Sequence, residues 1–164
     1  MANQGYMTIT GPKDALISRG CSGYDSIGNK CQTAHIDKIM VLSFVHQIFN
    51  LENSKAATHQ PVVITKNIDK STPLLAQALA NRDLVDCEID FYRTSKVGGQ
   101  EKFFTVKLSG CVIADMTMVM PDTTSEDDAE PHETIGIRYS NITWNHHLAS
   151  TSAQTSWNAV AWNP

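Results

Sequence analysis

The segment FTVKLSGCVIADMTMVM, residues 104–120, decides the fold because apolar and polar side chains alternate along most of its length. Its even positions carry apolar or small residues, whereas polar residues such as Lys107 and Asp115 stand at odd positions. A period of two is that of a β-strand, in which successive side chains point to opposite faces. We therefore expect one long strand with one buried face, and Gly110 is the natural place for it to bend or bulge.

Two further segments are predicted as strands of the same kind. Residues 85–91 alternate in the same way, and residues 95–100, which include two adjacent glycines, join this strand to the first as a hairpin turn. Residues 134–148 also alternate, but their apolar positions change from odd to even numbers. A slip of one residue moves side chains to the other face of a sheet, so we expect a bulge near Ser140 and Asn141.

The remaining pattern predicts another strand and one helix. The continuous apolar run within residues 36–49 is typical of a strand covered on both faces. Thr72 suits the N-cap of a helix and Pro73 its first position, which predicts a short α-helix over about residues 72–81. The predicted fold is therefore mainly β, a two-sheet antiparallel β-barrel or sandwich with one short α-helix.

Length and charge limit the possible partners. The chain has 164 residues, the usual size of one domain, a net charge of −4 and a pI of about 5.8. Nucleic-acid binding needs a basic surface, and the basic residues here do not cluster. Residues 1–8 show no signal-peptide pattern, and no apolar run approaches the ~20 residues of a membrane helix. We expect synthesis in the cytoplasm without a signal peptide, no nucleic acid as partner, and no membrane insertion.

The four cysteines do not form a metal-binding motif. Cys87 and Cys111 fall within predicted strands, where a small core residue is the simplest interpretation. Cys21 and Cys31 flank a loop rich in glycine and serine, and the sequence leaves open whether they form a disulfide after export. None of the four belongs to a CxxC pair, which a zinc-finger site would require.

No residue is predicted to be catalytic. The sequence contains no Gly-x-Ser-x-Gly elbow and no glycine-rich phosphate loop followed by a helix. His146 and His147 are adjacent, so on a strand they point to opposite faces and cannot easily bind one metal ion. Asp86, Glu88 and Asp90 line one strand face and are interpreted as its solvated side. We therefore expect no enzyme activity, no cofactor and no metal.

Residues 64–75, ITKNIDKSTPLL, resemble the signature of the hemolysin-coregulated protein (Hcp) family, the tube subunit of type VI secretion. The signature residues are Thr65, Lys66, Asp69, Lys70, Ser71, Thr72 and Pro73. The resemblance covers residues 1–148, which we interpret as an Hcp-like tube domain. Residues 149–164 are expected to form a loosely ordered C-terminal tail.

The resemblance implies a structural function and a set of partners. The family's fold is similar to that of phage tail-tube proteins, and six copies form a ring. Rings stack into a tube beneath a VgrG spike and inside a contractile sheath, and the tube is exported through the type VI system. Small effector proteins bind in the lumen of the ring, which also protects them. The sequence does not indicate which effectors bind or which strand face lines the lumen.

A mainly β chain of this size supports an assembly on physical grounds. Long strands leave sheet edges and apolar area that a single domain of this length cannot fully cover. A head-to-tail contact between identical copies covers those surfaces and gives a closed ring if its rotation closes. The loop over residues 50–60 matches the family's protruding loop, and we expect it to contact a neighbouring subunit. The polar residues proposed for this contact are Asn50, Glu52, Asn53, Ser54 and Lys55.

Two alternative functions remain open at this point. A β-barrel can hold a small hydrophobic ligand, and Met116, Met118 and Met120 could line such a pocket, although alternating methionines are more often core residues. A hydrolase is the other alternative, but no residue of the sequence indicates its active site. A ring runs at about six times the mass of the 18.1 kDa chain, which distinguishes it from a monomeric pocket protein.

Overall fold

A computed structural model describes residues 3–125 and 130–157 of the chain. Ten strands and two α-helices lie in these residues, and the helices are α1 (Tyr24–Ile27) and α2 (Thr72–Asn81). The strands are β1 (Gln4–Thr10), β2 (Ile39–Val45), β3 (Ile48–Phe49), β4 (Thr58–His59), β5 (Val62–Asn67), β6 (Val85–Thr94), β7 (Gln100–Val119), β8 (His132–Arg138), β9 (Asn141–His146) and β10 (Thr151–Ser156). Neither helix is long and apolar enough to cross a membrane.

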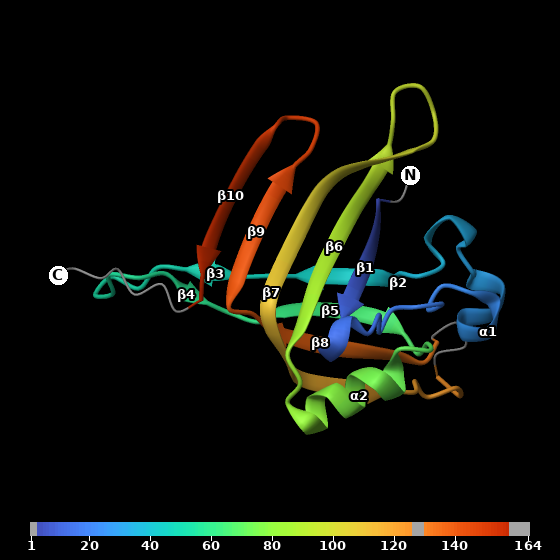
Figure 1. The fold of residues 1–164 in the computed structure, drawn as a ribbon. Helices are drawn as coiled ribbons and strands as arrows, with labels where there is room; N and C mark the ends of the chain where they lie inside the picture. Colours follow the sequence, from blue (N-terminus) through green and yellow to red (C-terminus); the bar gives the residue numbers. More distant parts are fainter. Residues whose placement is uncertain (1–2, 126–129, 158–164) are drawn as a thin grey trace.

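Eight of the strands form one antiparallel sheet that curls until it closes on itself. Their order is β10-β9-β7-β6-β1-β2-β5-β8, and β8 also pairs with β7. Strands β1, β2, β5, β8, β7 and β6 therefore form a closed barrel, from which β9 and β10 continue along the first half of β7 (Figure 1). Strands β3 and β4 form a separate hairpin that projects to the side. The prediction of a mainly β, antiparallel barrel with a helix over residues 72–81 is confirmed.

The barrel closes because β7 bends in the middle. Its first half pairs with β6 and β9, and its second half, from Val112 onward, pairs with β8. Gly110 stands at the bend with a φ of 61°, a conformation that glycine adopts without strain. Its backbone N–H donates to Asp86 Oδ1 at 3.0 Å, and its carbonyl accepts from Ser140 Oγ at 3.0 Å. The predicted bend at Gly110 is confirmed.

The bend also changes which residues of β7 are buried. Before Gly110 the buried apolar side chains stand at even positions, Val106 and Leu108, whereas after it they are Cys111 and Ile113. A second irregularity between Ile113 and Asp115 shifts the register again. The prediction of one buried face over the whole of residues 104–120 was therefore wrong, because each inserted residue rotates the following side chains to the other face.

The change of phase within residues 134–148 marks a corner between two strands. A bulge was predicted near Ser140 and Asn141, but the chain there leaves β8 and starts β9. Strand β8 pairs with the second half of β7, and β9 pairs with the first half. The predicted change of phase is therefore present, but it arises because the chain leaves the second half of β7 at the end of β8 and pairs with the first half of β7 as β9.

Apolar side chains from all six barrel strands meet in one core, and α2 packs across one end of it. Ile9, Ile64, Ile89 and Ile135 are fully buried, and Leu75 reaches the same core from α2. Strand β2 was predicted to be covered on both faces, which is wrong for the single chain. Its outward side chains include Leu42 and Val45, which are 53 % and 60 % exposed.

The segment after residue 148 is more regular than predicted. Residues 151–156 form β10, which pairs with β9 from Thr151 opposite His146 to Ser156 opposite Asn141. The expectation of a loose tail is wrong for these residues, since a neighbouring strand satisfies one side of their backbone. Residues 149, 150 and 157 of the predicted tail lie in turns on either side of β10, and residues 158–164 lie outside the described residues.

Replacing Gly110 with alanine tests the bend. A Cβ atom at this position would lie 2.9 Å from Ser140 Oγ and 3.0 Å from Ser140 Cβ, and the positive φ would be strained. We expect Gly110→Ala to lower the free energy of unfolding, measured in urea, by about 1–3 kcal/mol. Gly5→Ala is the control, because its Cβ would make only ordinary contacts with Val41. An equal effect of both changes would contradict this account of the bend.

Candidate functional site

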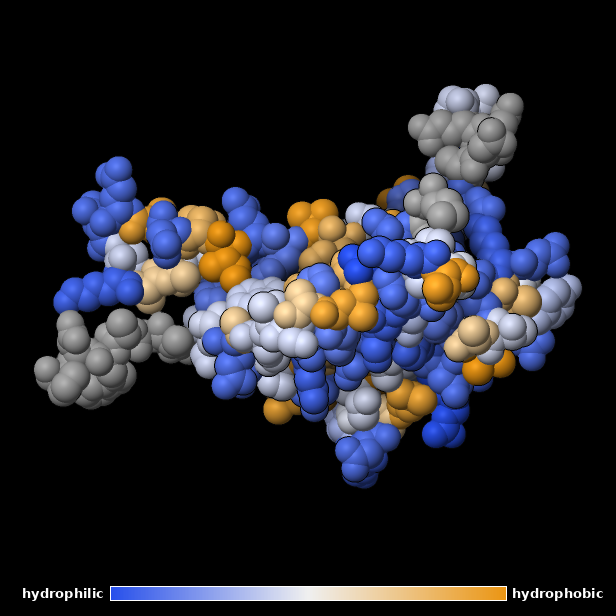
Figure 2. Space-filling view, turned by 90° about the horizontal axis from the view of Figure 1, so that it is seen from above, coloured by the Kyte–Doolittle hydropathy of each residue, from blue (hydrophilic) through white to orange (hydrophobic). Residues whose placement is uncertain are grey.

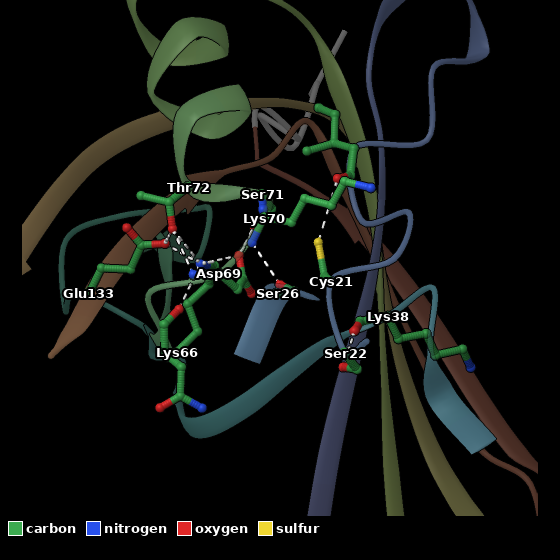
Figure 3. A network of polar contacts seen from close by, with 12 residues as sticks. Cys21, Ser22, Ser26, Lys38, Lys66, Asp69, Lys70, Ser71, Thr72 and Glu133 are labelled. Carbon is green, nitrogen blue, oxygen red and sulfur yellow. Dashed lines mark hydrogen bonds and ion pairs between the residues drawn. The ribbon is translucent and has the colours of Figure 1, made fainter. Parts of the chain in front are cut away.

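The signature segment encloses a buried cluster of charges beneath α2. Lys66, at the end of β5, is completely buried, and its Nζ donates to Asp69 Oδ1 at 2.9 Å and to Thr72 Oγ1 at 3.3 Å. The same ammonium group contacts the Glu133 carboxylate, which is also fully buried (Figure 3). It donates as well to the backbone carbonyl of Asn67 at 3.0 Å. One lysine thus joins β5, β8, the β5–α2 turn and the first turn of α2.

Strand register places these residues together. Lys66 and Glu133 are directly opposite on β5 and β8, and both side chains point into the barrel. Asp69 shapes the turn, because its carboxylate accepts from the backbone N–H of Ser71 at 2.8 Å while its own N–H donates to Thr72 Oγ1 at 3.1 Å. Buried charges are tolerated only when they are paired and hydrogen-bonded, so this network fixes α2 on the barrel, and of its carboxylate oxygens Glu133 Oε2 is buried without a hydrogen-bond partner.

The other signature residues lie around this cluster in different environments. Lys70 is exposed, and its backbone N–H donates to Ser26 Oγ at 2.8 Å. Thr65 is half-buried between the inward-facing Ile64 and Lys66, and Pro73 stands in the first turn of α2. Ser71, and not the predicted Thr72, occupies the N-cap position. Glu133 was not predicted, because it is distant in the sequence and only strand pairing brings it to Lys66.

The loop over residues 50–57 forms the tip of the β3–β4 hairpin. The five residues predicted for a subunit contact, Asn50, Glu52, Asn53, Ser54 and Lys55, are all exposed. Leu51 beside them is an apolar side chain that is 55 % exposed. Apolar side chains gather on the arm where this hairpin projects from the barrel (Figure 2). The hairpin therefore offers a mixed polar and apolar surface away from the core.

Several stretches of strand have a partner on one side only among the residues that the structure describes, the whole of β10 included, and two of these stretches combine an open edge with large exposed apolar side chains. Strand β1 pairs with β2 only from Ile39 to Val41, so residues 42–45 are paired with β5 alone. Residues 112–119 of β7 are paired with β8 alone. Each stretch carries exposed apolar side chains, Val45 on the first and Met118 on the second. Unprotected edges of this kind are suited to pairing with another chain.

The remaining candidate residues have structural roles. His147 Nε2 lies 2.7 Å from Thr105 Oγ1, and His146 Nδ1 accepts from the backbone N–H of Ala149 at 3.0 Å. Asp90 was predicted to be solvated but is buried, because it pairs with Lys38 at 3.0 Å and accepts from Thr105 at 2.8 Å. Within residues 3–125 and 130–157, no group of three His, Cys, Asp or Glu side chains is placed to bind a metal ion.

All four cysteines are free thiols in this structure. Cys87 and Cys111 are buried in the core, as predicted, and a hydrogen bond with Cys111 together with burial raises the pKa of Cys87 well above its ordinary value. Cys21 is buried too, and burial raises its pKa to about 11. Cys31 is half-buried. Thiols with raised pKa values are poor nucleophiles, so neither Cys21 nor Cys87 resembles a catalytic cysteine.

Comparison with known proteins identifies relatives over nearly the whole chain. Residues 6–146 match the family model described as "Type VI secretion system effector, Hcp". The chain is 37 % identical to the "Major exported protein" of Pseudomonas aeruginosa over 96 % of both sequences. Among solved structures it is similar to "Crystal structure of Hcp protein", with a TM-score of 0.88, 31 % identity and coverage of 96 % and 99 %. It is also similar to "Secreted protein Hcp3 from Pseudomonas aeruginosa", with a TM-score of 0.84, 36 % identity and coverage of 96 % and 100 %.

Lys66→Met tests the buried cluster. The change leaves the carboxylates of Asp69 and Glu133 buried without their cation, so we expect the free energy of unfolding in urea to fall by about 3–5 kcal/mol. Lys70→Met removes a lysine from the same signature, but an exposed one, and is expected to change stability by less than about 0.5 kcal/mol. Similar unfolding midpoints for the Lys66→Met variant and the unmodified protein would contradict the assigned role of this lysine.

Proposed function

Because the chain belongs to the Hcp family of the type VI secretion system, we propose that it is a structural subunit of the secretion tube, built from six-membered rings that stack. The tube leaves the cell through the type VI system, and the names of two relatives, "Major exported protein" and "Secreted protein Hcp3", support export. Its partners are other copies of itself, a VgrG spike at the tip, a surrounding sheath and small effector proteins in the lumen. The protein performs no catalysis in this role.

The open strand edges of β2 and β7 support the proposal of a ring. Residues 42–45 of β2 and residues 112–119 of β7 end the same four strands, in the order β2-β5-β8-β7, on opposite sides. Different edges that meet between identical copies make a head-to-tail contact, and such a contact closes into a ring when its rotation allows. Edge pairing of this kind also covers Val45 and Met118, which the single chain leaves exposed.

The outward face of β2, β5 and β8 is our candidate for the lining of the lumen. Met40 and Leu42 on β2, Thr65 on β5 and His132 on β8 border a groove of about 620 Å³. The ion pair of Lys30 and Glu130 also borders this groove, and polar groups mixed with a few apolar side chains suit a surface that must hold different effectors and release them. The same four strands would continue from one subunit to the next if their edges pair, which places this face around the inside of a ring.

The alternative of a pocket for a small hydrophobic ligand is not favoured by the positions of the methionines. Met116 is half-buried, whereas Met118 and Met120 are 62 % and 76 % exposed. The inside of the barrel is filled by isoleucine, valine and leucine side chains. Met116 packs against the core, whereas the exposure of Met118 and Met120 agrees better with a contact between subunits than with an interior pocket.

Charges at the open edges should prevent ring formation. We expect the unmodified protein to run in analytical ultracentrifugation at about six times its mass of 18.1 kDa. Val45→Glu and Met118→Glu each bury an unpaired carboxylate in the proposed contact, so both should shift the protein to monomers at micromolar concentration. Val97→Glu is the control, since Val97 lies at the tip of the β6–β7 hairpin and is 96 % exposed. A monomeric unmodified protein would refute the ring itself, whereas rings that persist in both edge variants would refute only these edges.

The hairpin loop is proposed to contact a neighbouring subunit through Asn50, Glu52, Asn53, Ser54 and Lys55. Replacing residues 52–58 with a short Gly-Ser link removes the tip of the hairpin and leaves the barrel strands unchanged. We expect the variant to fold, as judged by circular dichroism, but to lose rings or stacked tubes in electron micrographs. A same-length replacement of the β6–β7 turn is the control. If rings and tubes both survive the loop replacement, this contact is wrong.

A further inference from the structure

Two histidines at the base of the β3–β4 hairpin share one buried tyrosine. His46, in the link between β2 and β3, places Nε2 at 2.9 Å from the Tyr139 hydroxyl. His59, on β4, places Nδ1 at 2.6 Å from the same hydroxyl. Tyr139 lies in the corner between β8 and β9 and is only 2 % exposed. The two hydrogen bonds thus attach both ends of the hairpin to the barrel.

Aromatic rings close the surroundings of this tyrosine. The rings of Trp157 and Tyr139 lie 5.0 Å apart, and Trp157 also stacks on His59 at 5.7 Å. The indole of Trp144 lies 6.5 Å from His46. These rings come from β9 and from the end of β10, so the cluster joins the hairpin to the strands on both sides of the corner. The backbone adds one bond at the hairpin base, from Gln60 N–H to the Gln47 carbonyl at 3.1 Å.

The hydrogen bonds of the Tyr139 hydroxyl with His46 and His59 require that one of the two imidazoles is neutral. The Tyr139 hydroxyl has one hydrogen to donate, so it donates to one histidine and accepts from the other. The histidine that accepts must be neutral, because a protonated imidazole has a hydrogen on both nitrogens. Protonating that ring removes the acceptor of the Tyr139 hydroxyl hydrogen, so one buried hydrogen bond is lost.

The charged groups around the cluster add to this effect. Burial lowers the pKa of His59, and burial together with the nearby His59 lowers the pKa of His46. The charged side chain that faces the cluster from the β8 side is Arg138, whose guanidinium lies 5.1 Å above the Trp157 ring. Among residues 3–125 and 130–157, no carboxylate is among the causes of either shift. Protonation of either histidine in acid therefore destabilises the arrangement in which both imidazoles bond to Tyr139.

We propose that His46, Tyr139 and His59 form an acid-sensitive latch that holds the β3–β4 hairpin on the barrel at neutral pH and releases it in acid. Lowered pKa values in the folded state mean that the unfolded or opened state binds more protons at low pH. The latch is complete above the ordinary histidine pKa of 6.5 and weakens as the pH falls below it. Opening the latch frees the loop over residues 50–57 while the barrel core stays closed.

Hydrogen–deuterium exchange of the full chain tests the latch. We expect the backbone amides of residues 47–60 to exchange roughly tenfold faster at about pH 5.5 than at about pH 7.5, after correction for the intrinsic rates. The amides of β6 and β7 should show no such change. Equal protection of residues 47–60 at both pH values would refute the proposal.

Three variants separate the latch from a general effect of acid. Tyr139→Phe removes the shared hydroxyl, so residues 47–60 should exchange fast at both pH values. His59→Gln keeps an uncharged acceptor in place, so combined with His46→Gln it should keep the hairpin protected and abolish the acid response. His132→Gln, at the far end of β8, should respond to acid as the unmodified protein does. An acid response that survives in the His46→Gln, His59→Gln variant would place its cause elsewhere.

The latch has a consequence for assembly that rests on the proposed function. If the hairpin loop contacts a neighbouring subunit, stacked tubes should dissociate over the same pH range in which the hairpin opens. Sedimentation recorded on the same samples distinguishes the two ideas. Faster exchange without any change in mass supports the latch and argues against the loop contact, whereas a change in mass with unchanged exchange argues against the latch.

Discussion

Closure of the barrel depends on β7 taking part in both halves of the sheet. A single strand of this length cannot follow two differently oriented sets of neighbours unless it turns its hydrogen-bonding direction part of the way along. Gly110 provides that turn, and the side chains of Asp86 and Ser140 satisfy its backbone groups where the ladder is interrupted. The corner between β8 and β9 lies opposite the bend, so both halves of the sheet change direction at one place.

The buried lysine cluster fixes the position of α2 at one end of the barrel, just as Gly110 fixes the direction of β7 in the middle. Lys66 bonds to groups from β5, α2 and β8, none of which would be stable in the core alone. Replacing such a network by apolar residues would often cost little stability, so its value lies more in specificity than in strength. Only one placement of α2 lets Asp69 and Glu133 share the ammonium group. The signature in the sequence is thus a device that positions a helix.

Local patterns in the sequence predicted most of the strands, and their failures have definite physical causes. The alternation over residues 104–120 identified the long strand and the bend, but burial after Gly110 depends on how many residues the irregularities insert. The signature located Lys66 and Asp69, whereas Glu133 became visible only through the β5–β8 register. Residues 151–156 have little apolar character, so their strand is specified by pairing with β9 and not by their own pattern. Long-range pairing is the information that a single sequence lacks.

The residues that fix the barrel and the surfaces that are proposed to contact other subunits lie in separate parts of the chain. The strongest constraints, Gly110 and Lys66, act inside the barrel, while the open edges of β2 and β7 and the tip of the β3–β4 hairpin are free of them. A subunit that must assemble and later come apart needs a barrel that keeps its shape in both states and contacts that can be lost separately. The His46–Tyr139–His59 cluster lies at the boundary between these two parts, where a change of one hydrogen bond moves the hairpin without disturbing the core. Loss of a hydrogen bond in this cluster can alter the proposed assembly because it moves the β3–β4 hairpin, which carries the proposed contact, and leaves the barrel folded.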